Sequence, residues 1–141
     1  MYNCTTLGGY LVKIIIDTSV LVGTISKQII RSELTEKSIG FNLYAPESVI
    51  WEVGNAISLM FKKKTANLNQ ALILLHEFRK IHIEYIPINL DDAMRLCFNH
   101  DIYAYDAYIL QAALEYGYPL LSLDKRQLGI AQKLKVKIIG L

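Results

Sequence analysis

Short apolar runs alternate along the chain with longer segments in which apolar residues recur every three or four positions. The runs predict buried strands at 11–16, 42–45, 82–88, 119–123 and 136–139. The periodic segments predict helices at 19–36, 46–63, 67–80, 90–99, 105–116 and 125–134. Because strands that alternate with helices build a parallel sheet covered on both sides, the pattern predicts an α/β fold. We expect a single-domain parallel sheet of about five strands flanked by helices.

Local signals mark where several of these elements begin and end. The segment 17–19, Asp-Thr-Ser, directly follows the first strand and offers side chains that cap helices. Pro46 suits the first turn of a helix, and Gly117 is placed to end one. Residues 1–9 follow neither period, so we predict an irregular N-terminal arm before a domain that spans 10–141.

Composition narrows the class of protein. The chain has 141 residues, of which 52% are hydrophobic and 20% charged, and this balance is typical of one globular domain. The net charge of +2 sets up no overall field for nucleic acid, so any such binding must come from a local patch. Cys4 and Cys97 form no paired motif, which fits a reducing cytoplasm. We expect no signal peptide and no membrane span.

Four acidic residues stand where a buried element would otherwise be apolar. Asp17 and Asp124 directly follow predicted strands, and ligands of parallel sheets bind beyond the carboxyl ends of strands. Asp106 lies on the apolar face of its helix, and Glu52 lies at the edge of another apolar face. Each residue alone reads as a helix cap or a partly exposed acid. Together they predict one shared pocket.

Four like charges in one pocket repel each other and raise each other's pKa, and a divalent cation resolves that repulsion. Carboxylate oxygens suit Mg²⁺ or Mn²⁺, as one or two ions, whereas no histidine joins the set to favour zinc. We expect Asp17 and Asp106 to bind the metal directly. Asp124 and Glu52 are expected to bind through water or to orient the nucleophile, and the sequence does not separate these roles.

Three segments carry a resemblance to a known family: IIIDTSVLV, SVIWEVGNAI and IYAYDAYILQAALEYGYPLLSLDKRQL. They resemble PIN-domain ribonucleases, of the small stand-alone kind found as toxins in VapBC-type toxin–antitoxin pairs. The resemblance runs from about Leu11 onward. It implies a PIN-like fold and matches Asp17, Glu52, Asp106 and Asp124 to an acidic metal-binding quartet.

The resemblance also implies supporting residues and an activity. Ser19 and Asn55 match positions that commonly help the site, and Ser122 stands where relatives often carry Thr. The implied activity is metal-dependent endonucleolytic cleavage of RNA. The implied partners are a second copy of the chain and a small antitoxin. Of the basic clusters in the chain, Lys125 and Arg126 are the better candidates for RNA contacts, because they adjoin the last acid.

Other functions stay open at this point. A housekeeping RNA-processing nuclease shares the same chemistry as a toxin. A regulatory phosphoacceptor domain would need an acid pair after the first strand and a Lys after a late strand, and the chain has Asp124 there instead. A purely interacting subunit with a degenerate site is disfavoured by the complete quartet. Trp51, opposite the apolar face of its helix, predicts a surface buried by another chain.

Overall fold

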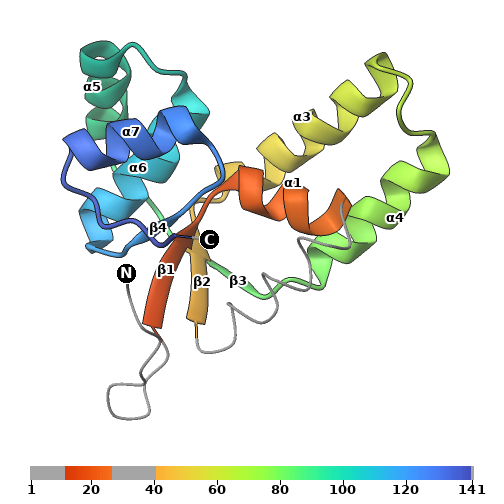
Figure 1. Ribbon diagram of the computed structural model, residues 1–141, viewed down its shortest axis with the longest axis horizontal. Helices are drawn as coiled ribbons and strands as arrows, with labels where there is room; N and C mark the ends of the chain where they lie inside the picture. Colours follow the sequence, from red (N-terminus) through yellow and green to blue (C-terminus); the bar gives the residue numbers. More distant parts are fainter. Residues whose placement is uncertain (1–11, 27–40, 141) are drawn as a thin grey trace.

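The computed structural model describes residues 12–26 and 41–140, and within them four parallel strands form one sheet (Figure 1). The strand order is β3-β2-β1-β4. The strands are β1 (Val12–Ile16), β2 (Phe41–Ala45), β3 (Ile83–Tyr85) and β4 (Leu120–Leu121). The predicted α/β class and the parallel sheet are therefore confirmed. The predicted arm 1–9 and the end of the helix predicted at 19–36 lie outside the described residues.

The helices fall into two groups, one on each side of the upper part of Figure 1. The helices are α1 (Thr18–Ser26), α3 (Ser48–Lys62), α4 (Leu68–Arg79), α5 (Leu90–His100), α6 (Ala104–Tyr116) and α7 (Lys125–Lys133). Helix α1 packs against α3 and α4, whereas α5 packs against α6. The two groups meet where α3 contacts α6. This meeting point lies beyond the carboxyl end of β1, where the chain enters α1.

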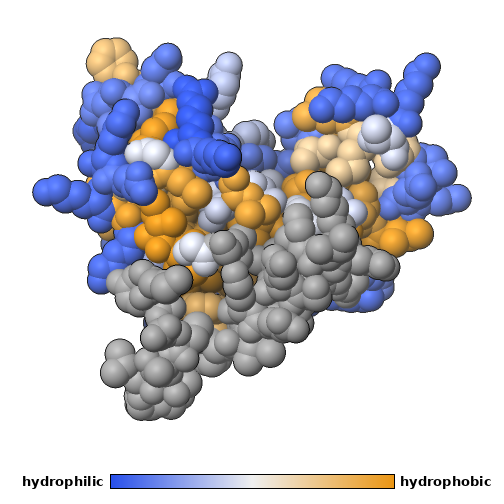
Figure 2. Space-filling view, in the orientation of Figure 1, coloured by the Kyte–Doolittle hydropathy of each residue, from blue (hydrophilic) through white to orange (hydrophobic). Residues whose placement is uncertain are grey.

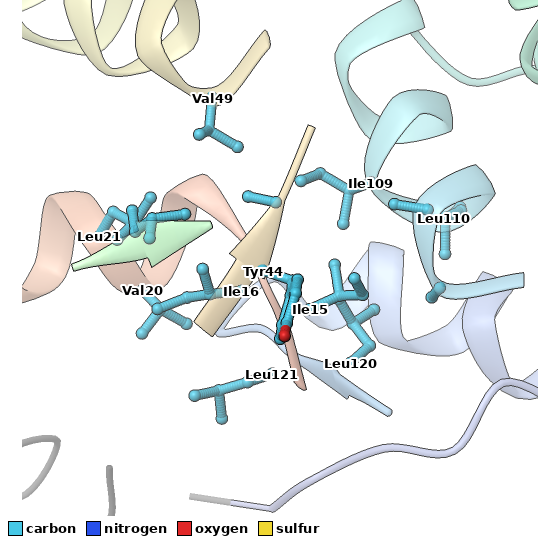
Figure 3. Close-up of a cluster of buried hydrophobic side chains, with 14 of the residues drawn as sticks. Ile15, Ile16, Val20, Leu21, Tyr44, Val49, Ile109, Leu110, Leu120 and Leu121 are labelled. Carbon is cyan, nitrogen blue, oxygen red and sulfur yellow. The ribbon is translucent and has the colours of Figure 1, made fainter. Parts of the chain in front are cut away.

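The core forms around the continuous apolar run at the end of β1. Ile14 and Ile15 are fully buried, as expected of a central strand covered on both faces. Figure 3 shows Ile15 within this cluster of buried side chains. Helix α3 adds Val49 from one side, and α6 adds Ile109 and Leu110 from the other. Because both helices are held to the sheet by this packing, any polar side chains on their inner faces take fixed positions.

The helix ends follow from local chemistry. Asn67 and Gln70 form a capping box at the start of α4, with hydrogen bonds of 2.8 and 2.9 Å. Gly117 has φ 67° and ends α6 in the left-handed conformation that glycine tolerates, so that prediction is confirmed. Helix α3 begins at Ser48 rather than at the predicted Pro46, and Glu47 stands at its N-cap position.

The predicted strand at 136–139 is shorter than expected. Only Ile138 pairs with the sheet, as a single parallel bridge to Leu120. Two backbone hydrogen bonds hold this bridge, from Leu120 N to Lys137 O at 2.8 Å and from Ile139 N to Leu120 O at 2.9 Å. Strand β4 is itself two residues long, so it offers little ladder for a fifth strand. No helix of the described segments is long and apolar enough to cross a membrane.

Candidate active site

A pocket of about 300 Å³ opens beyond the carboxyl ends of β1 and β4, between the two helix groups. The surface in Figure 2 is notched between the same groups. All four predicted acids line the pocket, and so do the predicted Ser19 and Asn55. The lining residues are Asp17, Thr18, Ser19, Val22, Glu52, Asn55, Ala56, Leu59, Asp106, Asp124 and Gln127. The fold thus brings together acids that lie up to 107 positions apart in the chain.

Asp17 is the most enclosed of the acids, at 4% exposure. It directly follows β1, and its backbone N–H donates to the carbonyl of Leu121 in β4 at 3.0 Å, which fixes it at the sheet edge. Its Oδ2 accepts hydrogen bonds from Ser19 Oγ at 2.6 Å and Ser122 Oγ at 2.7 Å. Burial raises the pKa of Asp17, and the two hydroxyl groups lower it only in part.

Ser19 and Ser122 are held in orientations that direct their hydrogens at Asp17. The Ser19 Oγ accepts the backbone N–H of Leu123 at 3.0 Å, and the Ser122 Oγ accepts that of Asp124 at 3.0 Å. Because each hydroxyl oxygen already accepts an N–H group, its own hydrogen is free to donate to the carboxylate. Ser122 is buried and does not line the pocket, so it supports the site by holding Asp17 from the interior of the protein.

Glu52 reaches the pocket from the middle of α3 and is partly buried. Thr18 Oγ1 donates a hydrogen bond of 2.5 Å to Glu52 Oε2, which ties the start of α1 to α3. Burial raises the pKa of Glu52, and the charges of Asp17, Asp106 and Asp124 raise it further. The repulsion among the four acids that the sequence predicts is therefore present in the folded chain.

Asp106 occupies the third position of α6, where an acid often serves only the helix end. The N-cap residue of α6, Tyr103, makes no side-chain capping bond. Burial raises the pKa of Asp106, and the charges of Asp124 and Asp17 add to this, while Arg126 opposes it. Asp106 is thus placed among acids, at a helix start that favours its charge but with no side chain donating to it in the described residues.

Asp124 combines a helix cap with a place in the pocket. Its Oδ1 accepts the backbone N–H groups of Arg126 at 2.9 Å and Gln127 at 3.1 Å, so it caps α7. Both bonds use the same oxygen, and Asp124 still lines the pocket. The capping role considered for Asp124 is confirmed, and it coexists with a position at the shared site.

The basic residues stand at the rim. Lys125 and Arg126 are exposed in the first turn of α7. Arg126 Nη2 donates a hydrogen bond of 2.9 Å to the backbone carbonyl of Asp101, which lies in the turn between α5 and α6. Within the described parts of the chain, no Lys or Arg forms an ion pair with any of the four acids. Among the described residues, the four acids therefore have no direct cationic partner to offset their negative charge.

Two buried polar residues of the pocket were not predicted from the sequence. Thr18 is 4% exposed and holds Glu52, and Gln127 is 2% exposed on α7. A signal for Gln127 was available, because it shares a helix face with Ile130 and Ala131 at spacings of three and four. A polar side chain on an apolar stripe is the same signal that identified Asp106.

The donor set fits a hydrated Mg²⁺ or Mn²⁺ ion. In residues 12–26 and 41–140, no three Asp, Glu, His or Cys side chains are gathered tightly enough to form a metal site on their own. Mg²⁺ binds through one or two carboxylates and keeps several waters, so it does not need such a closed shell. Four mutually repelling carboxylates around one small pocket supply the oxygen ligands and the negative charge that this kind of ion requires.

The fold and the acidic site define an α/β protein of the nuclease type, and comparison with known proteins identifies the family. The family model described as PIN domain matches residues 14–133. The chain belongs to the PIN domain family, which indicates a nuclease and confirms the resemblance drawn from its sequence. No curated protein matches the chain.

Solved structures share the fold at low sequence identity. VapBC2 from Rickettsia felis, solved bound to a DNA fragment from its promoter, has a TM-score of 0.65 and 13% identity, over 90% of this chain and 97% of that one. FitAcB from Neisseria gonorrhoeae has a TM-score of 0.58 and 17% identity, over 90% and 96%. PAE2754 from Pyrobaculum aerophilum has a TM-score of 0.62 and 19% identity, over 84% and 86%.

Proposed function

We propose that the chain is a metal-dependent endoribonuclease that hydrolyses RNA phosphodiester bonds, and that it acts as the toxin of a type II toxin–antitoxin pair. The observation that carries the proposal is the convergence of Asp17, Glu52, Asp106 and Asp124 on one pocket. Membership of the PIN domain family supports the nuclease part. The fold shared with VapBC2 and FitAcB, both toxin–antitoxin proteins, supports the toxin part.

The metal would be held by the acids themselves. Asp17 and Asp106 are the candidates for direct ligands of one or two Mg²⁺ or Mn²⁺ ions, with Asp124 and Glu52 bound through water. Such an ion supplies positive charge for the developing phosphate charge and makes a bound water more acidic. The chain's own part is to present carboxylates in fixed orientations, which the packing of α6 against β1 and of α3 against α1 and α6 provides.

Glu52 is suited to handle the proton of the attacking water. Thr18 occupies Oε2, so Oε1 is the oxygen left to accept that proton. The pKa of Glu52 is raised towards neutral pH, and a carboxylate with such a pKa can both accept a proton and release it later. Water attack at phosphorus, with the P–O3′ bond breaking and the 3′ oxygen leaving and taking up a proton, would leave a 5′-phosphate and a 3′-hydroxyl group.

Basic side chains at the rim of this acidic pocket would attract RNA. Arg126 is positioned in advance by the Asp101 carbonyl, so its guanidinium loses little freedom on binding a phosphate group. Lys125 is adjacent and exposed. Because overall charge is only +2, these two cations supply a local attraction that the whole molecule lacks.

A homodimer and a small antitoxin complete the proposed assembly, in the cytoplasm. Trp51 is 64% exposed on α3, and α4 exposes Leu68 and Ile73 by 65% and 60%. Large apolar side chains in this number favour burial by another chain. The antitoxin is expected near α3 and the helix predicted at 19–36. A short open reading frame immediately upstream would favour the toxin over a housekeeping RNA-processing nuclease.

Purified protein and an end-labelled RNA oligonucleotide of mixed sequence test the proposed chemistry. We expect cleavage with Mn²⁺, no cleavage in excess EDTA, and recovery when Mn²⁺ is restored. Product ends should carry a 5′-phosphate and a 3′-hydroxyl. Activity that survives excess EDTA, or products ending in a 2′,3′-cyclic phosphate, would show that a different nuclease chemistry is at work.

A further inference from the structure

We infer that Gln127 is a positioning residue for Asp17: its side-chain amide holds the carboxylate by hydrogen bonding without neutralising the charge. The part of the inference that concerns metal binding rests on the metal site proposed above. Gln127 lines the pocket from α7 and is 2% exposed. An amide enclosed to this degree is costly unless its nitrogen and oxygen both find partners.

The amide has two orientations, and one satisfies the surroundings better. With Nε2 turned towards Asp17, it lies 3.2 Å from Oδ2 and 3.3 Å from Oδ1, so it can donate to the carboxylate. In the other orientation, Nε2 makes only a long contact of 3.4 Å with the backbone carbonyl of Asp106, and the amide oxygen faces the carboxylate oxygens. Because two acceptors repel each other, the first orientation is favoured.

The backbone of Gln127 is fixed by a second acid of the same pocket. Its N–H donates to Asp124 Oδ1 at 3.1 Å as part of the cap of α7. One residue thus joins two of the four acids, Asp124 through its backbone and Asp17 through its side chain. The cap sets where α7 begins, and so it also sets where the Gln127 amide reaches.

An amide does something here that a cation cannot do. A Lys or Arg against Asp17 would form an ion pair and compete with a metal ion for the carboxylate. The amide donates hydrogen bonds and leaves the full negative charge in place. Ser19 and Ser122 also donate to Oδ2, so three donors gather near that oxygen. Residues that orient ligands in this way commonly change metal affinity by about 10–100-fold.

A matched pair of substitutions tests the inference. Gln127→Met keeps the length of the side chain and removes both polar atoms of the amide. The control is Gln111→Met on α6, where Gln111 is also buried, at 7% exposure, and donates to Glu115 Oε2 at 3.1 Å away from the pocket. Gln127→Leu provides a second apolar variant, so the test does not depend on the folding of one protein, and circular dichroism confirms the fold of each.

Calorimetric titration with Mn²⁺ gives the first readout. We expect Gln127→Met and Gln127→Leu to bind Mn²⁺ about 10–100-fold more weakly than wild type, and Gln111→Met to bind like wild type. RNA cleavage at subsaturating Mn²⁺ should fall in parallel and recover in part at high Mn²⁺. Equal Mn²⁺ affinity in the Gln127 and Gln111 variants would overturn the role of Gln127 while leaving the nuclease intact.

A metal-free readout separates this inference from the proposed function. The side-chain amide signals of Gln127 in a nitrogen–proton NMR spectrum are assigned by their loss in Gln127→Met. We expect slow exchange of these hydrogens in the metal-free wild type and faster exchange in Asp17→Ala. Protected signals in a wild type that binds no Mn²⁺ would support the contact and contradict the proposed metal site. Unprotected signals in a wild type that binds Mn²⁺ would contradict the contact alone.

Discussion

The first turns of α5 and α6 carry an acid at the same helical position, and the two acids differ in almost every physical respect. Asp92 is the third residue of α5 and Asp106 is the third residue of α6. Asp92 is half-exposed, and Arg95 forms an ion pair with it. Asp106 is partly buried, and burial raises its pKa, with the charges of Asp124 and Asp17 raising it further.

The helix starts themselves explain part of this difference. Asn89 caps α5 by accepting the backbone N–H of Asp92 at 3.0 Å, whereas Tyr103 makes no side-chain cap at α6. The first turn of α5 therefore has both its side-chain cap and the charge partner of its acid within the same helix region. No side chain among the described residues donates to Asp106, and the charges of Asp124 and Asp17, from other elements, repel it. An acid surrounded in this way supports the cation site proposed above.

The largest expected effect is on RNA cleavage, and it tests the difference between Asp106 and Asp92 directly. Asp106→Asn removes the charge and keeps the shape, and we expect Mn²⁺-dependent RNA cleavage to fall by about 10²-fold or more, as when one preorganised electrostatic group of an active site is lost. Asp92→Asn makes the same change at the same helical position and should leave cleavage unchanged. Cleavage rates of the two variants under one set of conditions check this. Equal rates would remove Asp106 from the site.

The fold was predictable because its signals are local. The run Ile14 to Ile16 is apolar at every position, which only a strand buried on both faces requires, and Gly117 ends α6 where it was expected. The strand predicted at 136–139 is reduced to a single bridge because pairing depends on the partner strand. Strand β4 has only two residues, so an apolar run beside it forms one bridge at Ile138.

The site was predictable only in outline. Asp17 and Asp124 follow strands, and that position alone brings them to one edge of a parallel sheet. Gln127 and Thr18 were missed because their partners, Asp17 and Glu52, are far away in the sequence. The sequence singled out Asp106 by its place on the apolar face of its helix. The charges that surround Asp106 and Asp92 after folding could not be predicted in the same way, because they come from other elements.

Metal binding should produce the next largest effect, on stability. An ion that binds only the folded chain, present at a concentration about 100 times its dissociation constant, adds about 2.7 kcal/mol to the free energy of unfolding. We expect Mn²⁺ to raise the melting temperature of wild type and of Asp92→Asn by several degrees, and that of Asp106→Asn by much less. Differential scanning calorimetry measures the shifts. An unmoved melting curve in wild type at saturating Mn²⁺ would contradict a shared metal pocket.

The stability of the metal-free protein at lower pH provides a further test of the difference between Asp106 and Asp92. The folded-state pKa values of Asp17, Glu52 and Asp106 are raised above the ordinary values of 3.8, 4.5 and 3.8, mainly by burial. As the pH falls through these raised values, the folded chain takes up protons before the unfolded chain does, so stability rises. This gain is complete below the unfolded-state pKa values and is lost again as the pH rises.

We therefore expect the metal-free melting temperature to rise as the pH is lowered from neutral towards about 5, above the ordinary carboxyl range. The rise should be smaller in Asp106→Asn, which lacks one of the titrating groups, and it should keep its wild-type size in Asp92→Asn. Thermal melts across this pH range, with EDTA present, measure it. A larger rise in Asp106→Asn than in Asp92→Asn would contradict the assignment of the buried charge to Asp106.

The smallest effect concerns the two caps alone. Asn89→Ala removes the oxygen that accepts the Asp92 N–H, and such a loss costs about 1 kcal/mol of unfolding free energy. Tyr103→Ala removes no capping bond at the equivalent position of α6, and Tyr103 is 79% exposed, so its effect should stay within about 0.5 kcal/mol. Urea unfolding of both variants without metal gives the two values. If Tyr103→Ala costs as much as Asn89→Ala, the start of α6 is held by contacts of Tyr103 that the absence of a side-chain cap does not reveal. Asp106 would then stand on a helix end as firmly fixed as that of Asp92. The difference between the two acids would in that case come from the burial of Asp106 and from the charges of Asp124 and Asp17.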